Sequence, residues 1–464
     1  MRLSEHFLKN ALPGISFVSE IFPDFAQFST DTRTLHQGDI FIALEGPHFD
    51  GHNFIDQAVS LGVSGLLIAE SKKECLKKVD KAALKKMFVA TVSNTKTALI
   101  QLATAWRDQF TYPVVGITGS VGKTSTRQQL TSILEHNKTN YVATVGNQNN
   151  IIGVALSVLK MRPEHEVAVF ELGINKRGEM AQLVALSKPT TALVTGIGHA
   201  HMEGLGSIVD IAAEKRDIFS LFKEDNIGII NGDQLLLSNI AYRHPVIKFG
   251  SKTTNQVQAR KIRIESDHTS FILKLYNEKY KIDLESSHLG VVFNTLAAIS
   301  MAHLLKVPTA IILQAIQKKL IVESRFEQRP LKAGKGLMID DCYNASPESM
   351  KAALLALQKI ETKAQKVAVL GDMLELGVNS AFWHRQLGRF LRKVPTLKKV
   401  YLVGSLVEWT KKTVPVGLAV EHAATWQDAL EMVKKDLNED SVVLVKGSNG
   451  IGLGNLVHAM TQES

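Results

Sequence analysis

The chain has 464 residues, of which 45% are hydrophobic and 21% are charged, a composition typical of a globular protein with two to four domains. The formal net charge is +9, but the Lys and Arg residues are scattered and only 6% of residues are aromatic, which argues against a nucleic-acid partner. A polyanionic small substrate accounts for the basic excess equally well. No segment is apolar for long enough to be a signal peptide or a transmembrane segment, so we expect a cytoplasmic protein.

The first 90 residues contain short apolar segments separated by turn residues. "DIFIAL" at 39–44 and "GVSGLLIA" at 62–69 are typical of strands bounded by Gly, Pro and Asp. They predict a small N-terminal α/β domain over residues 1–90, with an apolar core of its own.

A larger α/β unit follows, for which we predict a central domain over residues 91–322. Helical spacing at 98–106 leads into the apolar run "YPVVGIT", then into a glycine-containing loop and the helical segment "TSTRQQLTSILEHN". Further buried strands are predicted at 166–172 and 190–198, with helical segments between them, so the sheet should be mostly parallel and doubly wound. Residues 257–286 alternate apolar and polar side chains, which predicts an antiparallel flank.

From about Glu323 a third set of strands and helices begins. The apolar segments "GLMIDD", "KVAVLGD", "KVYLVGS" and "SVVLVKG" predict a Rossmann-like α/β domain over residues 323–464.

The segment "TGSVGKTS" at 118–125 has the features of a phosphate-binding loop between a strand and a helix. Gly119 and Gly122 would let backbone N–H groups surround phosphate oxygens, Lys123 would neutralise phosphate charge, and the Thr124 hydroxyl would bind Mg²⁺. The alternative, a glycine-rich surface turn, does not account for this strand–loop–helix order. The predicted nucleotide-binding loop consists of Thr118, Gly119, Ser120, Val121, Gly122, Lys123, Thr124 and Ser125.

Polar residues follow the next two predicted strands. Glu171 ends one of them, and "GIGHAHMEG" places His199, His201 and Glu203 after the other. Ligands of a parallel sheet lie at the carboxyl ends of its strands, so these side chains should lie beside the phosphate loop. A carboxylate at a buried strand end is costly without a cation, which favours Glu171 as a metal ligand. For each histidine alone, a structural hydrogen bond is the better explanation.

Lys215 lies in "DIAAEKRDIF", a helical segment with charged residues on both sides. By itself this pattern indicates a solvated charge run.

Several longer motifs, taken together, resemble those of the Mur ligase family, ATP-dependent enzymes that form amide bonds in peptidoglycan precursors. That family writes its phosphate loop T-G-[ST]-x-G-K-[ST], without the additional upstream glycine of the commoner phosphate loops. "GNQNNIIGVALSVL", "ELGINKRGEM", "GHAHMEGLGS", "IDDCYNASPESMKAAL" and "VAVLGDMLELG" are most similar to the MurF branch of the family. The resemblance covers essentially the whole chain. It implies a ligase that joins D-alanyl-D-alanine (D-Ala-D-Ala) to UDP-N-acetylmuramoyl-tripeptide through an acyl phosphate, using ATP and Mg²⁺, and we expect a monomer.

The same resemblance implies roles for individual residues. Those with a catalytic role are Lys123, Lys215 and His201. The implied nucleotide contacts outside the loop are Asn294, Arg325 and Asp341. The implied Mg²⁺ ligands are Thr124, Glu171, His201 and Lys215, the last being a lysine that carries a carbamate in the family. Implied substrate contacts are Asp31, Thr32, Arg33, Asn147, Asn149, Asn150, Tyr343 and Asn344.

The chain departs from the MurF pattern at four positions. Gly290 and Val291 replace a His-Asn pair, so an adenine contact from that pair is not expected. Ser346 stands where the family usually has Asn, and Asn449 where it usually has Arg, which removes a fixed cation near the substrate end of the third domain.

Two other functions are compatible with the motifs. A MurE-type ligase, which adds a single amino acid, or a folylpolyglutamate synthase would share the central domain, but "DDCYNASP" favours the MurF branch and the uridine-type first domain argues against the folate enzymes. A phosphate-loop ATPase acting on a protein partner would hydrolyse ATP without small-molecule acceptors, whereas a ligase should release phosphate only with both co-substrates present.

Overall fold

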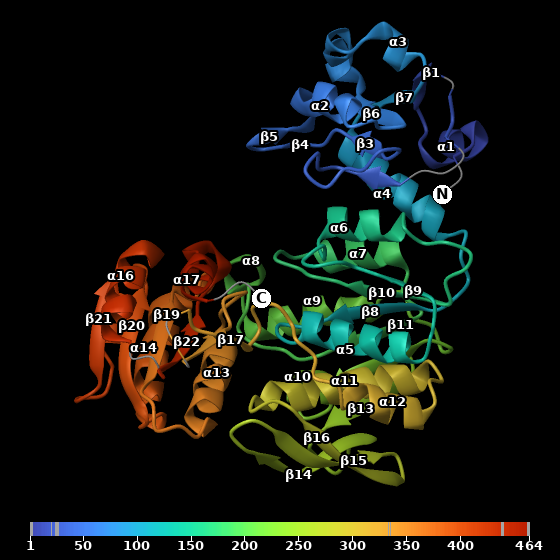
Figure 1. Ribbon diagram of the computed structural model, residues 1–464. Coiled ribbons are helices and arrows are strands. Elements are labelled where there is room, and N and C mark those ends of the chain that lie inside the picture. The colour runs from blue at the N-terminus through green and yellow to red at the C-terminus, as the bar shows by residue number, and fades with distance from the viewer. Residues whose placement is uncertain are drawn as a thin grey trace.

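Figure 1 presents the computed structural model, which describes residues 3–19, 21–23, 27–332, 334, 336–437 and 440–461. Three sheets follow one another along the chain: the N-terminal sheet lies at one end of the molecule, and the C-terminal sheet lies beside the central one. This is the predicted three-part α/β fold, while the residue limits of the three domains stay a prediction. Within the described residues, no helix is long and apolar enough to cross a bilayer.

The N-terminal sheet has five strands in the order β1-β7-β6-β3-β2. Its strands are β1 (Ser16–Ser19), β2 (Phe28–Ser29), β3 (Ile40–Ile42), β6 (Gly65–Ala69) and β7 (Phe88–Val92). Its helices are α1 (Glu5–Ala11), α2 (Ile55–Ser60) and α3 (Lys81–Leu84), and a small hairpin pairs β4 (Glu45–Gly46) with β5 (Phe49–Asp50). β3 and β6 lie within the predicted segments 39–44 and 62–69, so both strand predictions are confirmed.

The central sheet has nine strands in the order β16-β15-β14-β13-β12-β11-β8-β10-β9. Its strands are β8 (Val114–Thr118), β9 (Tyr141–Ala143), β10 (Val167–Glu171), β11 (Thr191–Val194), β12 (Ile227–Asn231), β13 (Val246–Gly250), β14 (Val257–Ile264), β15 (Thr269–Leu275) and β16 (Glu278–Leu284). In this spatial order, all neighbouring strands from β9 through β8 to β14 pair in parallel, whereas β14 pairs antiparallel with β15, and β15 with β16. This confirms the predicted parallel sheet with an antiparallel flank.

Helices cover both faces of this sheet. On one face lie α4 (Thr95–Arg107), α6 (Ile151–Val158) and α7 (Glu179–Ser187), and on the other lie α5 (Lys123–His136), α11 (Leu289–Leu304) and α12 (Thr309–Ile316). Three further helices in this part are α8 (Met202–Leu205), α9 (Ile208–Arg216) and α10 (Leu235–Ser238).

The C-terminal sheet has six strands in the order β17-β18-β22-β19-β20-β21, of which only the edge strand β17 is antiparallel. Its strands are β17 (Glu327–Pro330), β18 (Leu337–Asp340), β19 (Lys366–Gly371), β20 (Leu397–Val403), β21 (Ala419–Ala423) and β22 (Val442–Lys446). Its helices are α13 (Pro347–Lys359), α14 (Ser380–Phe390), α15 (Glu408–Lys411), α16 (Trp426–Asp436) and α17 (Leu453–Met460).

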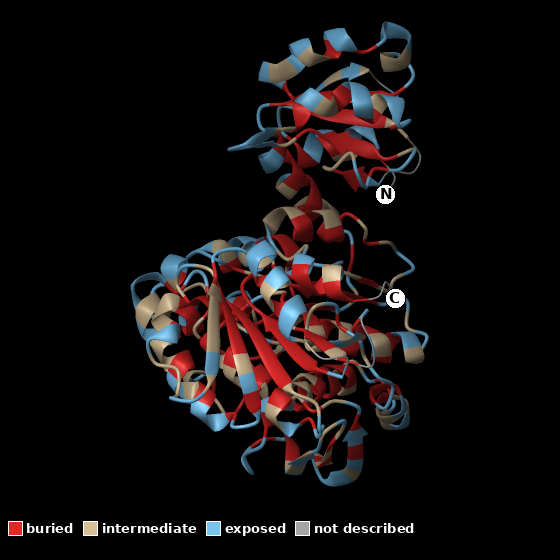
Figure 2. Ribbon diagram, turned by 60° about the vertical axis from the view of Figure 1, so that its left-hand side comes forward, coloured by how far each residue is buried: buried red, intermediate tan, exposed pale blue. Residues whose placement is uncertain are grey.

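The strands of all three sheets are largely buried (Figure 2). One apolar cluster runs from the N-terminal domain, including Leu8 and Phe88, through Leu99 and Leu102 of α4 to Phe170 of the central sheet. This cluster is shared by the two domains because α4 packs against both sheets, so the predicted core of the first 90 residues is separate on one face of their sheet only. A separate cluster on the far face of the N-terminal sheet does stay within that domain.

Candidate active site

The predicted phosphate loop connects β8 to α5, as the strand–loop–helix pattern requires. Gly122 is the N-terminal cap of α5 and has a φ of +86°, a left-handed conformation that favours glycine. A Cβ at Gly122 would lie 2.3 Å from Asn294 Oδ1, and one at Gly119 would lie 1.9 Å from Thr195 Oγ1. Both glycines are therefore required by close packing around the loop, and Asn294 lies against it, while its contact with a nucleotide stays a prediction.

The other loop residues divide into those that hold the loop and those that face the cleft. The Thr118 hydroxyl donates to the Leu172 carbonyl at 2.8 Å, and Ser120 Oγ donates to the Gly198 carbonyl at 3.0 Å. Lys123 Nζ donates to the Gly119 carbonyl at 2.9 Å, so its ammonium lies over the loop backbone. Burial lowers the pKa of Lys123, and the nearby Glu171 carboxylate opposes that shift.

Glu171, the last residue of β10, lies beside the loop as the parallel register predicts. Its side chain is 1% exposed, and its Oε1 accepts hydrogen bonds from Thr124 Oγ1 at 3.0 Å and from Asn149 Nδ2 at 2.8 Å. Arg127 Nε lies 3.4 Å from Oε2. The loop hydroxyl and a buried carboxylate thus form one oxygen-rich group.

The C-terminal part of the chain reaches this group through Arg325. Its Nη2 donates to Thr124 Oγ1 at 2.9 Å, and its guanidinium lies 4.1 Å from the centroid of the Tyr343 ring. Burial raises the pKa of Tyr343. Arg325, 201 positions beyond Thr124 in sequence, thus contacts the loop directly, and Tyr343 packs on Arg325.

A cleft of about 400 Å³ lies between the loop, the start of α11 and the C-terminal domain. The predicted residues that line it are Ser120, Val121, Gly122, Lys123, Ser125, His201, Asn294, Arg325, Asp341, Tyr343 and Asn344. The structure thus brings most of the predicted nucleotide-binding residues to one cavity.

Lys215 lies on α9 and is fully buried. Within the described parts of the chain, its ammonium makes no ion pair, and burial together with the charge of Lys123 moves its pKa well below the ordinary value. The alternative of a solvated charge run is therefore wrong for this residue. Its neighbour Glu214 is also buried and accepts a hydrogen bond from Met180 N at 3.0 Å.

The two histidines after β11 contact the C-terminal domain. His199 Nδ1 lies 2.5 Å from Glu348 Oε1, and its ring lies 4.3 Å from that of Trp383. His201, which has a φ of +58°, pairs through Nδ1 with Glu375, and this hydrogen bond lowers the pKa of the Glu375 carboxyl. No group of three or more His, Cys, Asp or Glu side chains is arranged to hold a metal among the described residues. A metal-binding role for His201 stays a prediction.

The remaining predicted substrate residues lie outside this cleft. Asn149 contacts Glu171 from the loop after β9, Asn150 caps α6 through Gly153 N at 3.0 Å, and Asn147 is exposed. In the N-terminal domain Arg33 forms an ion pair with Asp31 at 2.6 Å, and Thr32 lies between them in the turn after β2.

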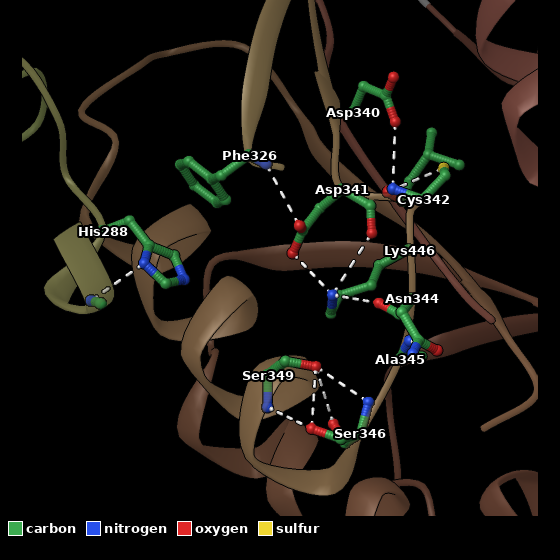
Figure 3. A network of polar contacts seen from close by, with 12 residues as sticks. His288, Phe326, Asp340, Asp341, Cys342, Asn344, Ala345, Ser346, Ser349 and Lys446 are labelled. Atoms are coloured by element: carbon green, nitrogen blue, oxygen red, sulfur yellow. Dashed lines mark hydrogen bonds and ion pairs between the residues drawn. The ribbon is translucent and has the colours of Figure 1, made fainter. Parts of the chain in front are cut away.

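The structure also identifies cleft residues that the sequence analysis missed (Figure 3). His288 caps the first turn of α11, two residues before Gly290, and its ring centroid lies 5.1 Å from that of Phe326. An aromatic pair therefore stands beside the position that lacks the family's His-Asn pair. Lys446, buried at the end of β22, forms an ion pair with Asp341 at 2.8 Å.

The other two departures have different surroundings. Ser346 caps α13 through a reciprocal pair of hydrogen bonds with Ser349, a role that Asn also fills well. Asn449 is exposed and lies outside the residues that line the cleft.

Comparison with known proteins identifies the family of this chain. The Mur ligase middle domain matches residues 117–302, and the Mur ligase glutamate ligase domain matches residues 324–449. The chain is 34% identical over 435 residues to UDP-N-acetylmuramoyl-tripeptide–D-alanyl-D-alanine ligase of Bacillus subtilis, covering 92% of each chain.

Solved structures agree with this match. The crystal structure of MurF from Acinetobacter baumannii is 28% identical, with a TM-score of 0.84 over 99% of this chain and 98% of that one. The structure of MurF ligase from Thermotoga maritima in complex with ADP is 26% identical, with a TM-score of 0.78 over 93% of this chain and 96% of that one. Sequence, fold and cleft agree along nearly the whole chain, which belongs to the Mur ligase family.

Proposed function

We propose that the protein is a MurF-type ligase, which joins D-Ala-D-Ala to UDP-N-acetylmuramoyl-tripeptide with ATP. The observation that carries the proposal is the shared cleft, in which the phosphate loop of the central domain meets Arg325 and Tyr343 of the C-terminal part. A ligase needs this arrangement, because the acyl phosphate that forms from ATP must meet the acceptor amine in an enclosed space before water reaches it. The full-length relative in Bacillus subtilis, named for this reaction, supports the same substrates.

The phosphate loop supplies the groups that receive the triphosphate of ATP. Backbone N–H groups at the start of α5 point toward the loop, and the helix dipole favours a negative charge there. Lys123 releases the Gly119 carbonyl and pairs with the transferring phosphate, since a phosphate is a far stronger partner than a neutral carbonyl. Arg325 donates to Thr124, so its guanidinium would be a second cation beside the transferring phosphate.

The donor set beside the loop fits a magnesium ion. Mg²⁺ prefers oxygen ligands and is held by one or two carboxylates together with phosphate oxygens, and the buried Glu171 carboxylate with the Thr124 hydroxyl provides such oxygens. When bound there, the ion would supply positive charge that offsets the charge developing on the phosphates.

In the proposed reaction, the terminal carboxylate of the tripeptide attacks the γ-phosphate and releases ADP, forming an acyl phosphate. The amine of D-Ala-D-Ala then attacks the acyl carbon, and the tetrahedral intermediate collapses to the amide and inorganic phosphate. The contacts of His199 with Glu348 and of His201 with Glu375 hold the C-terminal domain against the central one. This closure would keep water from the acyl phosphate.

We also propose that Lys215 acts as a carbamate. A neutral lysine amine attacks the carbon of CO₂, an N–C bond forms, and one proton leaves for solvent. Its burial and lowered pKa favour the neutral amine that this step requires. The product places a negatively charged oxygen pair near Lys123, where an ammonium would be repelled.

The substrate contacts predicted for the N-terminal and C-terminal domains belong to the same proposal. Asp31, Thr32 and Arg33 would bind the uridine end, and Tyr343 and Asn344 would lie near the dipeptide. We also propose that the protein acts as a monomer. The use of ATP and a UDP-linked precursor places the proposed reaction in the cytoplasm.

Mass spectrometry of the product tests this function. Incubation of the protein with Mg²⁺, ATP, UDP-N-acetylmuramoyl-tripeptide and D-Ala-D-Ala should yield a product heavier than the tripeptide substrate by one D-Ala-D-Ala minus one water. In parallel, the UDP-linked dipeptide with single amino acids should give no product. Addition of a single amino acid to the dipeptide would identify a MurE-type ligase instead and overturn the proposal.

A further inference from the structure

Lys446 is a buried cation at the wall of the cleft. It ends β22, its side chain is 2% exposed, and its Nζ lies 2.8 Å from Asp341 Oδ2. The same Nζ donates to the Asn344 carbonyl at 2.9 Å and to the Asp341 carbonyl at 3.3 Å. All three acceptors belong to the loop that follows β18 (Figure 3).

These contacts occupy the whole hydrogen-bonding capacity of Lys446. A lysine ammonium has three N–H donors, and here three acceptors of one loop surround it. No donor is left for a phosphate or a carboxylate of a ligand. Lys446 therefore acts on the loop of residues 341–344 rather than directly on a bound molecule.

The loop that Lys446 holds is connected to the phosphate loop by a short series of contacts. Asp341 Oδ1 accepts a hydrogen bond from Phe326 N at 3.2 Å, and Tyr343 N donates to the Ser324 carbonyl at 3.2 Å. The residue between Ser324 and Phe326 is Arg325, which packs on the Tyr343 ring and donates to Thr124. The conformation of the loop therefore determines where the Arg325 guanidinium stands.

We propose that Lys446 is a positioning residue for nucleotide binding: it fixes residues 341–344 so that Asp341, Tyr343 and, through them, Arg325 face the phosphate loop. This inference rests on the proposed function, because it takes the cleft to be the ATP site. Without the ammonium, Asp341 would keep a charge with no cation beside it at the cleft wall, and the loop would lose three hydrogen bonds at once.

Lys366 offers a matched control. It is also a buried lysine of the C-terminal sheet, 4% exposed, and its Nζ donates to the Gln358 carbonyl at 3.0 Å. Lys366 is the first residue of β19 and Lys446 is the last residue of the neighbouring parallel strand β22. The two lysines therefore lie at opposite ends of these strands. Lys366→Met removes a buried ammonium from the same domain without touching the cleft.

The test is calorimetric titration of the full-length protein with Mg²⁺ and the non-hydrolysable analogue adenylyl imidodiphosphate, with thermal unfolding measured in parallel. We expect Lys446→Met to raise the Kd by about tenfold or more, and Lys366→Met to leave it within about twofold even where both lower the unfolding temperature. Equal changes in Kd for the two variants would overturn the inference. Failure of the wild-type protein to bind the analogue would instead contradict the proposed function.

A double-mutant cycle separates positioning from a general loss of packing. Asp341→Asn alone should weaken binding of the analogue, because it removes the charge that pairs with Lys446. In the Lys446→Met background the same change should cost little or restore part of the affinity, because it removes an unpaired charge. If the change in Kd of the double variant equalled the product of the changes in the two single variants, Lys446 would not act through Asp341.

Discussion

Lys123 is the residue whose charge the reaction depends on most directly. In the structure its ammonium donates to the Gly119 carbonyl, and the next residue, Thr124, donates its hydroxyl to Glu171. Lys123→Ala removes the loop's cation from the transferring phosphate, so we expect phosphate release to fall by a factor of about 10² or more. The fold should be kept, because the lysine makes only this one hydrogen bond among the described residues. Turnover and thermal unfolding, measured together, check both statements, and substantial activity in a folded variant would refute the role.

Lys215 presents a different problem, because a buried ammonium without an ion pair is unfavourable. We expect Lys215→Ala to be nearly inactive while still binding ATP, and small carboxylates such as acetate or formate to restore part of its rate. Lys215→Arg should gain nothing from these additives, since a guanidinium neither forms a carbamate nor leaves space for a carboxylate. Normal turnover by Lys215→Ala would contradict the carbamate.

The lowered pKa of Lys215 predicts that the stability of the protein depends on pH, which can be measured without substrate. In bicarbonate-free buffer the unfolded chain holds a proton on Lys215 up to a pKa of about 10.4, whereas the folded chain releases it at a lower pH. Stability should therefore rise with pH between these two values, by up to about 1.4 kcal/mol per pH unit. Urea unfolding of Lys215→Met should lack this contribution. An identical pH slope in both proteins would show that the folded-state pKa of Lys215 is ordinary.

At the scale of single elements, the start of α13 shows how a departure from the family pattern is accommodated. Ser346 Oγ accepts a hydrogen bond from Ser349 N at 3.3 Å, and Ser349 Oγ accepts one from Ser346 N at 2.9 Å. Both Ser and Asn cap helices well, so Ser346→Asn should leave the free energy of unfolding nearly unchanged, whereas Ser346→Ala should lower it by about 1 kcal/mol.

Urea denaturation measures this difference, and α16 provides the control. Thr425 caps that helix with the same reciprocal arrangement, through Asp428, and lies outside the cleft-lining residues. Thr425→Ala should cost a similar amount of stability. If Ser346→Ala were neutral while Thr425→Ala was not, the capping role of Ser346 would be wrong.

The elements that carry the phosphate chemistry were predictable because their signals are local. The strand, loop and helix around Lys123 and the strand ending at Glu171 each lie within a short segment, and a parallel register brings their ends together. β12 and β13 were not identified individually, although "IGIIN" and "VIKFG" are short apolar runs of the strand type. Lys215 was ambiguous for the opposite reason: its charged neighbours suggest an exposed face, and only tertiary packing buries it.

At the scale of the whole molecule, the contacts between domains were beyond any local pattern. Arg325 and Thr124 are 201 residues apart, and His201 and Glu375 are 174 apart. The resemblance to Mur ligases implied that these regions meet, but not which side chains pair. The continuous core through α4 was also missed, since the apolar face of one helix does not reveal that two sheets share it.

These contacts define the central claim, that the molecule couples ATP to two small co-substrates in a cleft closed by its C-terminal domain. Phosphate release, measured with ATP, UDP-N-acetylmuramoyl-tripeptide and D-Ala-D-Ala each omitted in turn, tests it most directly. The account predicts rapid release with all three present and nearly none when either co-substrate is absent, because the acyl phosphate forms only on the tripeptide and is discharged by the dipeptide amine. Steady ATP hydrolysis without the two co-substrates would contradict it and indicate a phosphate-loop ATPase.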